Sequence, residues 1–481
     1  MTSSTSQLRH PLSLLGTAVW AIVAVVAFHL AYELAALSCL IGLYVFALVQ
    51  LSRAATPVRA FLAGWLTGLL VFGPQLAFMF GVFGEFGVVL WLIGSFWIGL
   101  FVVLGHGAIE RFGTRWAVGL LPMLFIGLEY FRSELYPLKF SWLAPGYTFA
   151  GHGQPLLVPH VGVYGVGFLL TLVAAGLTHV RARIAFGVGA SLLIALGVVA
   201  NVGWASPTKT APEKADTDGP LVVGIQMEFP STIRIVAALD KAVSQHPDFD
   251  LLVLSEYTFE RTPPLAVLDW CRQNGRYLIV GGKDSVEDRP DDFRNTAFVI
   301  SPDGEVVFKQ AKSVPIQFFA DGLPAEEQRL WDSPWGKIGI CICYDLSYTR
   351  VVDELVRQGA QLLIVPTMDV TGWGQHEHRL HAKIAPTRAA EYGLPIVRVC
   401  SSGISQIVTP SGQVTESLPF PGQGESFAAR VRPVEKARIP IDRYLAPLGL
   451  IVTVLFVGFL VVESVLKSIR KARATRGVGV L

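Results

Sequence analysis

The chain has 481 residues, of which 52% are hydrophobic and only 16% are charged. A soluble globular protein carries about 25% charged residues, so this composition excludes an ordinary soluble enzyme. The 39 Lys and Arg residues nearly balance the 37 Asp and Glu residues, which argues against nucleic acid as a partner. Five cysteines without a framework spacing argue against a disulfide scaffold.

Long apolar runs predict a membrane-embedded protein, because a bilayer core of about 30 Å is crossed by roughly 20 helical residues. Runs of this kind predict a membrane α-helical bundle of about eight transmembrane helices, near residues 12–30, 34–51, 60–80, 86–108, 116–132, 157–178, 184–202 and 445–465. The chain then divides into a seven-helix transmembrane region (1–203), a polar insert (204–443), and a last transmembrane helix with a basic cytoplasmic tail (444–481).

The basic residues that flank the predicted spans indicate their orientation. With the N-terminus in the cytoplasm, twelve flanking Lys and Arg residues fall on the cytoplasmic side, and only Arg132 and Lys139 fall on the other side. The sequence therefore predicts that residues 204–443 lie outside the cytoplasm.

The insert has the pattern of an α/β domain, in which buried strands are covered by helices. The predicted strands are 221–225, 251–255, 277–280, 297–300, 305–308, 337–342, 361–366 and 395–400. The predicted helices are 231–246, 264–274, 349–358 and 378–392. Residues 301–304 (SPDG) predict a hairpin turn between two of the strands.

Three reactive side chains lie at or just beyond predicted strand ends, namely Glu256, Lys312 and Cys343. Strand ends in α/β folds point toward the crevice where ligands bind. A carboxylate that takes the thiol proton, a thiolate nucleophile and an ammonium that stabilises an oxyanion suit acyl transfer. On spacing alone, Cys343 could equally well be a buried cysteine that packs as a small hydrophobic residue.

The sequence around these residues resembles the nitrilase, or carbon–nitrogen hydrolase, superfamily. Residues 339–345 (GICICYD) resemble its nucleophile strand, 251–256 its strand with the catalytic Glu, and 303–312 its hairpin leading to the catalytic Lys. Residues 388–391 and 401–403 follow in the same order. The resemblance implies an αββα sandwich whose catalytic triad is Glu256, Lys312 and Cys343.

The sequence of the membrane region indicates which branch of this superfamily the chain resembles. Residues 129–132, 140–147 and 162–168 resemble the membrane signature of the apolipoprotein N-acyltransferases, so the resemblance covers nearly the whole chain. It implies a multi-pass enzyme of the bacterial cytoplasmic (inner) membrane, with a phospholipid as acyl donor and an apolipoprotein as acceptor. Cys343 would carry the acyl chain as a thioester, Glu256 would act as general base and acid, and Lys312 would hold the oxyanion. We expect a monomer.

Two aromatic residues are candidates for substrate binding. Tyr344 directly follows the candidate nucleophile. Trp373 resembles the family's aromatic residue on a loop near the nucleophile. It is either a lipid-facing lid or a packed side chain.

The segment after Lys312 departs from the family pattern, which continues into Val-Pro-Phe-Gly-Glu with a further essential carboxylate. Here the corresponding segment, residues 313–318 (SVPIQF), is two residues shorter than in the family and contains no Glu. Lys309 is therefore a rival for the catalytic amine, and Asp321 or Glu327 is a candidate for the missing carboxylate. The departure bears on the acceptor substrate more than on the nucleophile.

Other cysteines and histidines have simpler interpretations. Cys341 lies two residues from Cys343, and on an extended strand both would point the same way. His376, His378 and His381 suggest zinc, and His378 and His381 could share a helix face. No cysteine or carboxylate set in the sequence completes a site, so we expect no metal and no cofactor.

Two other functions stay open. A membrane-tethered nitrilase-like amidase acting on a small amide would use the same three residues, with water as acceptor and no lipid donor. A non-enzymatic membrane protein with an inactive nitrilase-like domain is the third hypothesis. The intact trio and the scarcity of charges inside the spans weigh against it.

Overall fold

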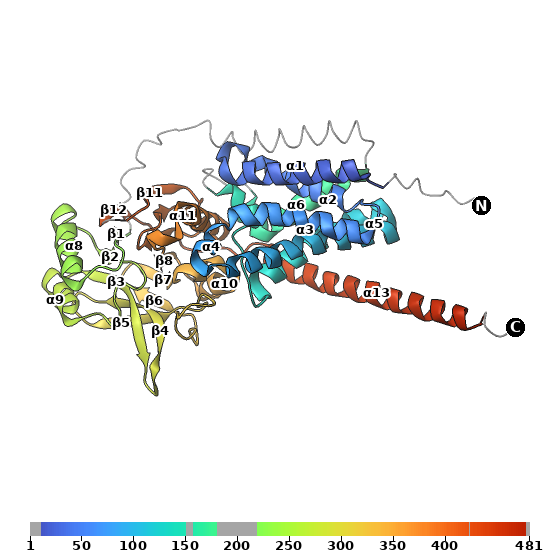
Figure 1. Ribbon diagram of the computed structural model, residues 1–481. Helices are drawn as coiled ribbons and strands as arrows, with labels where there is room; N and C mark the ends of the chain where they lie inside the picture. Colours follow the sequence, from blue (N-terminus) through green and yellow to red (C-terminus); the bar gives the residue numbers. More distant parts are fainter. Residues whose placement is uncertain (1–10, 151–156, 180–218, 423, 478–481) are drawn as a thin grey trace.

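The computed structural model describes residues 11–150, 157–179, 219–422 and 424–477. A bundle of long helices lies beside an α/β domain, and the C-terminal helix returns to the bundle (Figure 1). The predicted span 184–202 lies outside the described residues.

The bundle is built from apolar helices. They are α1 (Leu14–Glu33), η1 (Ala35–Leu40), α2 (Ile41–Leu51), α3 (Pro57–Gln75), α4 (Phe78–Phe83), α5 (Phe86–Tyr130), η2 (Phe131–Leu135), η3 (Pro145–Phe149), α6 (Val158–His179) and α13 (Asp442–Gly477). Among the described residues, five helices are long and apolar enough to cross a membrane: Leu14–Glu33, Pro57–Gln75, Phe86–Leu135, Val158–Thr178 and Asp442–Arg470. The count of eight spans stays a prediction.

The longest helix, α5, consists of two segments that fold back on each other at Gly113. Its backbone there has φ 72° and ψ 165°, which is not helical and which glycine adopts without steric cost. The rings of Phe101 and Phe125 lie 5.1 Å apart, whereas a straight helix would separate them by about 36 Å. The predicted spans 86–108 and 116–132 are therefore two separate helical segments.

The α/β domain contains two six-stranded sheets. The first has the order β12-β1-β2-β3-β4-β5, with β1 (Leu221–Gln226), β2 (Leu251–Val253), β3 (Tyr277–Val286), β4 (Arg289–Ile300), β5 (Val306–Ala311) and β12 (Glu425–Arg430). The second has the order β11-β10-β9-β8-β7-β6, with β6 (Leu330–Ser333), β7 (Gly336–Ile340), β8 (Leu362–Thr367), β9 (Ile396–Cys400), β10 (Ser405–Val408) and β11 (Val414–Leu418). The central strands β1, β2 and β3 are parallel, as are β7, β8 and β9.

Helices cover the outer face of each sheet. They are α8 (Thr232–Gln245) and α9 (Leu265–Asn274) on the first sheet, and α10 (Thr349–Gln358), α11 (Gln375–Ala382) and α12 (Ile384–Tyr392) beside the second. Between the sheets, Val222 and Ile338 belong to one buried core. Ile235 of α8 and Leu355 of α10 belong to the two outer cores. This is the expected αββα arrangement.

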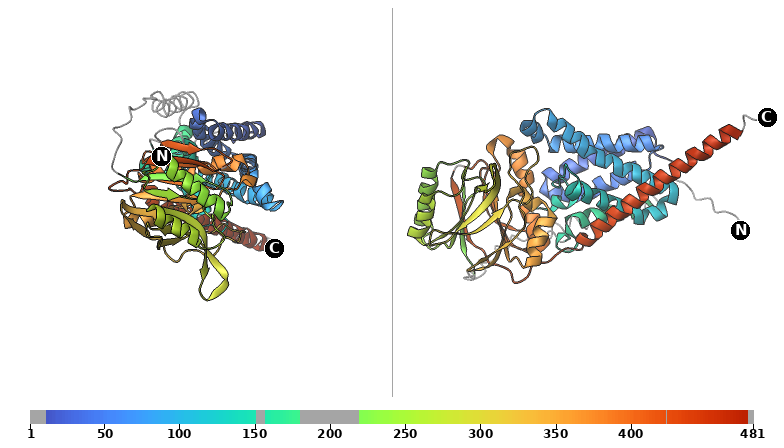
Figure 2. Two further views of the ribbon diagram at one scale, coloured as in Figure 1. Left: turned by 90° about the vertical axis from the view of Figure 1, so that its left-hand side faces the viewer. Right: turned by 90° about the horizontal axis from the view of Figure 1, so that it is seen from below.

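The membrane bundle and the α/β domain share one core. Tyr392 of α12 and Leu355 of α10 belong to the same buried cluster as Phe28 and Leu121 of the bundle. In Figure 2, right, the orange helix layer lies between the strands and the blue and teal helices. The second sheet is thus the one that faces the membrane helices.

Buried polar contacts fix this junction. Arg388 of α12 donates to the Ser347 carbonyl at 2.7 Å and to the Tyr147 hydroxyl at 2.9 Å. Glu391 accepts from the backbone N–H of Val163 at 2.9 Å. Because Ser347 ends the short helix η4 (Cys343–Ser347), the bundle supports the turn that carries the candidate nucleophile.

Candidate functional site

Cys343 lies at a sharp change of chain direction. Strand β7 ends at Ile340, and Cys343 begins η4 with φ 50°, a conformation uncommon for a residue with a side chain. Ile340 and Ile342 face the core between the sheets, and Cys343 joins that core, whereas Cys341 lies in the outer one. The prediction that Cys341 and Cys343 point the same way is wrong, because the strand ends before Cys343.

The Asp345 carboxylate holds the nucleophile turn against the segment that follows Lys312. It accepts from the backbone N–H groups of Ser313 at 3.1 Å, Val314 at 2.7 Å and Ile342 at 3.2 Å. Burial raises the pKa of Asp345 to about 6, although the positive charge of Lys312 opposes this effect. Asp345 therefore ties together two segments that are separate in the sequence.

A buried ion-pair cluster lies at the ends of the first sheet's strands. Lys312 Nζ is 2.9 Å from Glu256 Oε1 and 2.8 Å from Asp321 Oδ2. Asn295 of β4 donates from Nδ2 to Glu256 Oε1 at 2.5 Å and to Asp321 Oδ1 at 2.9 Å. All four side chains are buried. One lysine thus faces two carboxylates whose positions an amide fixes.

The rival residues lie at the surface. Lys309 pairs with Asp284 at 2.9 Å, and 48% of its side chain is exposed. Glu327 pairs with Arg329 at 3.2 Å, and 68% of its side chain is exposed. The structure therefore brings Lys312 and Asp321, rather than Lys309 and Glu327, to Glu256.

The environments of Glu256 and Asp321 drive their pKa values apart. Burial raises the pKa of Glu256, and Lys312 opposes this only in part. At Asp321 burial is outweighed by the Lys312 charge and by hydrogen bonds from Ile316 and Tyr257, so its pKa is lowered. Burial would lower the pKa of Lys312, but Glu256, Cys343 and Asp321 raise it well above its usual value. Asp321 can stay ionised beside the ammonium while Glu256 exchanges a proton.

Glu256 and Cys343 both form hydrogen bonds with the backbone of Met368. The Met368 N–H donates to Glu256 Oε2 at 2.7 Å, and its carbonyl accepts from Cys343 Sγ at 3.8 Å. Burial raises the pKa of the Cys343 thiol well above its usual value, and the Glu256 carboxylate adds to this effect. The thiol is therefore protonated at rest and needs a base to become a nucleophile.

An apolar cavity opens onto Cys343 between the bundle and the α/β domain. It encloses about 1070 Å³ of empty space, including the part that is open to solvent. Its wall contains Leu76, Met79 and Leu90 from the bundle and Phe319, Cys343, Tyr344 and Trp373 from the α/β domain. The Tyr344 hydroxyl donates to the Lys139 carbonyl at 3.0 Å. The ring of Trp373, in η5 (Thr371–Trp373), lies 6.2 Å from that of Phe319.

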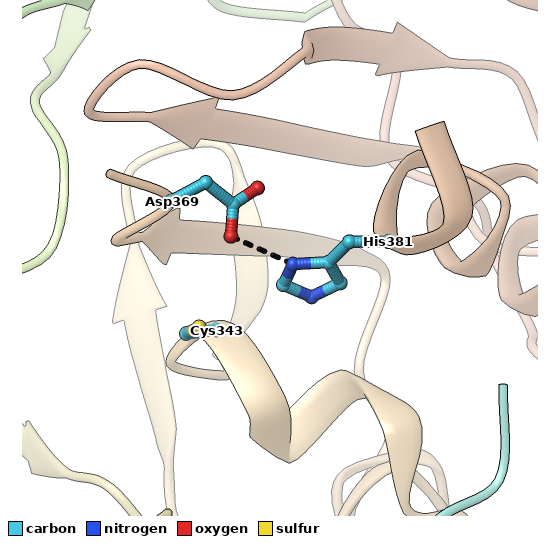
Figure 3. A group of neighbouring side chains, drawn as sticks. All are labelled: Cys343, Asp369 and His381. Atoms are coloured by element: carbon cyan, nitrogen blue, oxygen red, sulfur yellow. Dashed lines mark hydrogen bonds and ion pairs between the residues drawn. The ribbon is translucent and has the colours of Figure 1, made fainter. Parts of the chain in front are cut away.

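A second polar cluster lies beside Cys343. His381 Nδ1 is 2.8 Å from Asp369 Oδ1 (Figure 3), and Asp369 Oδ2 is 2.6 Å from Arg398 Nη2. His378 Nδ1 lies 2.9 Å from Glu377 Oε2 and 3.9 Å from Asp369 Oδ2. His378 and His381 thus share one face of α11, as predicted.

The structure places carboxylates beside these histidines, which the sequence did not predict. The expectation that no carboxylate set stands beside the histidines is wrong, because Asp369 and Glu377 do so. His376 lies apart, with Nε2 3.0 Å from the Gln75 carbonyl. The Arg398 guanidinium already supplies positive charge to Asp369, so we interpret the cluster as a charge network and assign it no metal.

Four site residues were missed at the sequence level, namely Tyr257, Asn295, Asp369 and Arg398. Asn295 of β4 and Arg398 of β9 are both fully buried. A buried polar residue needs a partner, so Arg398, a charged residue inside an apolar strand, was the available signal, whereas Asn295 follows a polar stretch of β4 and gave none.

Comparisons with known proteins cover both parts of the chain. Residues 15–176 match the family model of the apolipoprotein N-acyltransferase N-terminal domain, and residues 265–429 match that of carbon–nitrogen hydrolases. The apolipoprotein N-acyltransferase of Geobacter metallireducens is 25% identical over 440 residues, 78% of this chain and 84% of that protein.

Two further similarities cover less of the chain. The deaminated glutathione amidase of Dictyostelium discoideum is 30% identical over 171 residues, 31% of this chain and 59% of that protein. The crystal structure of a carbon–nitrogen hydrolase from Helicobacter pylori aligns with a TM-score of 0.38 and 17% identity, covering 44% of this chain and 88% of that one. Both the membrane domain and the hydrolase domain of the apolipoprotein N-acyltransferases are thus matched in one chain, which is similar to these enzymes over most of its length.

Proposed function

We propose that the protein transfers an acyl chain from a phospholipid to the N-terminal amino group of a diacylglyceryl-cysteine lipoprotein. The observation that carries this proposal is the apolar cavity, whose wall runs from membrane helices α3 and α5 to the thiol of Cys343. Such a cavity suits a lipid substrate that enters from the bilayer. The protein would work as a monomer in the bacterial inner membrane, with residues 204–443 facing the periplasm.

In the first half-reaction, Glu256 takes the proton of the Cys343 thiol. The thiolate attacks an ester carbonyl of the phospholipid, and the Lys312 ammonium stabilises the oxyanion that forms. Glu256 then returns the proton to the departing lysophospholipid oxygen, and a thioester remains on Cys343. The raised pKa of Glu256 makes it a stronger base than an ordinary carboxylate, which this step requires.

In the second half-reaction, the acceptor amine attacks the thioester. An amide bond forms, the carbon–sulfur bond breaks and the thiol is regenerated. Tyr344 and Trp373 would line the substrate path, because both lie in the cavity wall beside Cys343. Trp373 and Phe319 together would shield the thioester from water, which competes with the amine.

Intact-protein mass spectrometry after incubation with phospholipid tests this proposal. We expect a fatty-acyl mass increment, removable by hydroxylamine, on the wild type and on the control Cys271→Ala. Cys271 is packed between the first sheet and its outer helices, so that change removes a thiol elsewhere. A hydroxylamine-sensitive adduct on Cys343→Ala would contradict the assignment. Hydrolysis of a small amide without phospholipid, and without any acyl increment, would favour the amidase alternative.

A further inference from the structure

Asp369 and His381 form a second group of ionisable side chains beside Cys343. Glu256 and Lys312 follow strands of the first sheet, whereas Asp369 follows β8 of the second sheet and His381 lies on α11. Cys343 Sγ, an Asp369 carboxylate oxygen and a His381 ring nitrogen all lie within 4.8 Å of one another (Figure 3). Ionisable groups from both sheets thus lie near the nucleophile.

The His381 imidazole is held firmly. Its Nδ1 lies 2.8 Å from Asp369 Oδ1, and the Arg398 guanidinium fixes the other carboxylate oxygen at 2.6 Å. The indole of Trp142 stacks on the imidazole, with ring centroids 4.6 Å apart and planes 16° apart. Within the described part of the chain, no side chain or backbone carbonyl forms a hydrogen bond with His381 Nε2, and this atom is not completely buried.

The cavity distinguishes His381 from Glu256 and Lys312. Its wall includes Cys343 and His381 but, among the described residues, neither Glu256 nor Lys312. Both oxygens of Glu256 already accept hydrogen bonds, from Lys312 and Asn295 on Oε1 and from Met368 on Oε2. An acceptor amine that enters through the cavity therefore meets His381 first.

Burial keeps the His381 ring neutral. Burial lowers its pKa to about 4, against the opposing effect of Asp369, and Arg398 and His378 add to the lowering. Glu377, on the same helix, lies 3.8 Å from His381 Nδ1, and the Cys343 thiol is the further ionisable group that faces the ring. A neutral ring that donates from Nδ1 to Asp369 leaves a lone pair on Nε2.

We propose that His381 is a catalytic residue of the second half-reaction, in which its Nε2 takes the proton of the acceptor amine. This inference rests on the proposed function. As the amine attacks, the carbon–nitrogen bond forms and the amine proton moves to Nε2. The carbon–sulfur bond then breaks, and the proton passes from the imidazolium to the Cys343 sulfur. The Asp369 carboxylate stabilises the transient imidazolium, and the thiol returns to its starting state.

The two half-reactions can be measured separately. Acyl-enzyme formed from phospholipid is isolated, and a synthetic lipopeptide with an N-terminal diacylglyceryl cysteine is then added. Mass spectrometry follows first the gain and then the loss of the acyl increment. The main variant is His381→Asn, whose amide can donate to Asp369 in place of Nδ1 but has no counterpart of Nε2. Arg379→Asn, exposed on the same helix, is the matched control.

We expect His381→Asn to form acyl-enzyme within about threefold of the wild-type rate and to transfer the acyl group about 100-fold more slowly, the usual scale of a lost general base. Imidazole in solution should speed transfer by His381→Ala, and Arg379→Asn should match the wild type. Unchanged transfer, or acylation slowed as much as transfer, would overturn the inference. Should thermal melting show that His381→Asn is unfolded, His381→Gln is tested by the same two rates. A wild type that gains no acyl increment at all would instead refute the proposed function.

Discussion

The Lys312 ammonium lies 2.8 Å from the Asp321 carboxylate, so the lysine has a counter-ion other than Glu256. Asp321 is nine residues further along the chain, beyond the point where the family pattern places its extra carboxylate. It is held there by the Ile316 N–H at 2.7 Å and the Tyr257 hydroxyl at 2.8 Å. This arrangement leaves Glu256 free to gain and lose a proton beside a charge that is already balanced.

The first prediction concerns Asp321→Asn. Without the second carboxylate, the Lys312 charge acts on Glu256 alone, which lowers the pKa of Glu256 and weakens it as a base. Glu256 must be ionised to take the thiol proton, so the wild-type acylation rate falls as pH drops through the raised pKa. In the variant we expect a rate at least about tenfold lower and an acid limb shifted to lower pH.

The rate of acyl-enzyme formation across pH measures both effects. Glu327→Gln is the control, since its side chain lies at the surface beside Arg329. A wild-type rate and pH profile in Asp321→Asn would show that Asp321 has no part in the reaction.

The second prediction separates the two candidate lysines. Lys312→Ala should abolish acyl-enzyme formation and also destabilise the fold, since removing one partner of a buried pair costs about 3–5 kcal/mol. Lys309→Ala should change the unfolding free energy by less than about 0.5 kcal/mol and leave acylation unchanged, because its ion pair is exposed. Acylation rates and melting temperatures of both variants test this. Loss of acylation in Lys309→Ala alone would reverse the assignment.

Much of the α/β domain could be predicted because its central strands are continuous apolar runs. The strand predicted at 221–225 is β1 (Leu221–Gln226), and that predicted at 361–366 is β8 (Leu362–Thr367). Strands β6, β10, β11 and β12 were missed. They contain polar residues such as Asp332, Gln406 and Glu416, and β6, β11 and β12 lie at sheet edges, where one side of the strand has no partner strand.

The predicted helix 378–392 is two helices, α11 and α12, that meet at Lys383. Pro386 lies in the first turn of α12, a position that proline tolerates because the N–H groups there have no helical partner. Apolar periodicity continues across the join, so the sequence pattern alone did not reveal it.

The candidate site could be predicted only in part. Glu256, Lys312 and Cys343 could be predicted as candidates because a motif surrounds each of them. Asp321 lies in a loop without periodicity, and only the fold determines which loop carboxylate reaches Lys312. The pairing of Asp369 with His381 likewise depends on how α11 packs against β8, which no local pattern encodes.

The third prediction concerns the cavity wall. Trp373→Ala should slow acyl transfer from long-chain phospholipid by about tenfold, because it removes an aromatic side chain from the wall beside Cys343. The reaction of Cys343 with iodoacetamide should not slow, since the thiol and Glu256 are unchanged. Comparing the two rates distinguishes a role in lipid binding from a role in activating the thiol. Equal losses in both would contradict a lipid-binding role.

The fourth prediction concerns the junction between the domains. Arg388→Ala removes bonds to the Ser347 and Leu346 carbonyls and leaves Glu391 buried without this partner. We expect a loss of about 3–5 kcal/mol in stability, seen as a lower melting temperature in detergent. Arg357→Ala, whose side chain is 56% exposed, should melt like the wild type. Equal melting of the two variants would show that the junction adds no stability.

The last prediction concerns pH and His378. Burial would lower its pKa, but Asp369 and Glu377 raise it to about 9 from 6.5. A pKa raised on folding contributes stability that is complete below pH 6.5 and is lost as pH rises through 9. Glu377, with its pKa raised by burial to about 7, changes stability in the same direction. The melting temperature should therefore fall between pH 6 and pH 9.

His378→Asn should reduce that fall, whereas His160→Asn, at an exposed position, should preserve it. His381 has the opposite effect on the stability of the fold. Because its pKa is lowered on folding, the stability that it contributes is lost only as pH drops below 6.5 toward 4. A series of melting curves confined to pH 6–9 therefore reports mainly on His378 and its carboxylates. If His378→Asn kept the full wild-type fall, the proton on this imidazole would not hold Asp369 and Glu377 together.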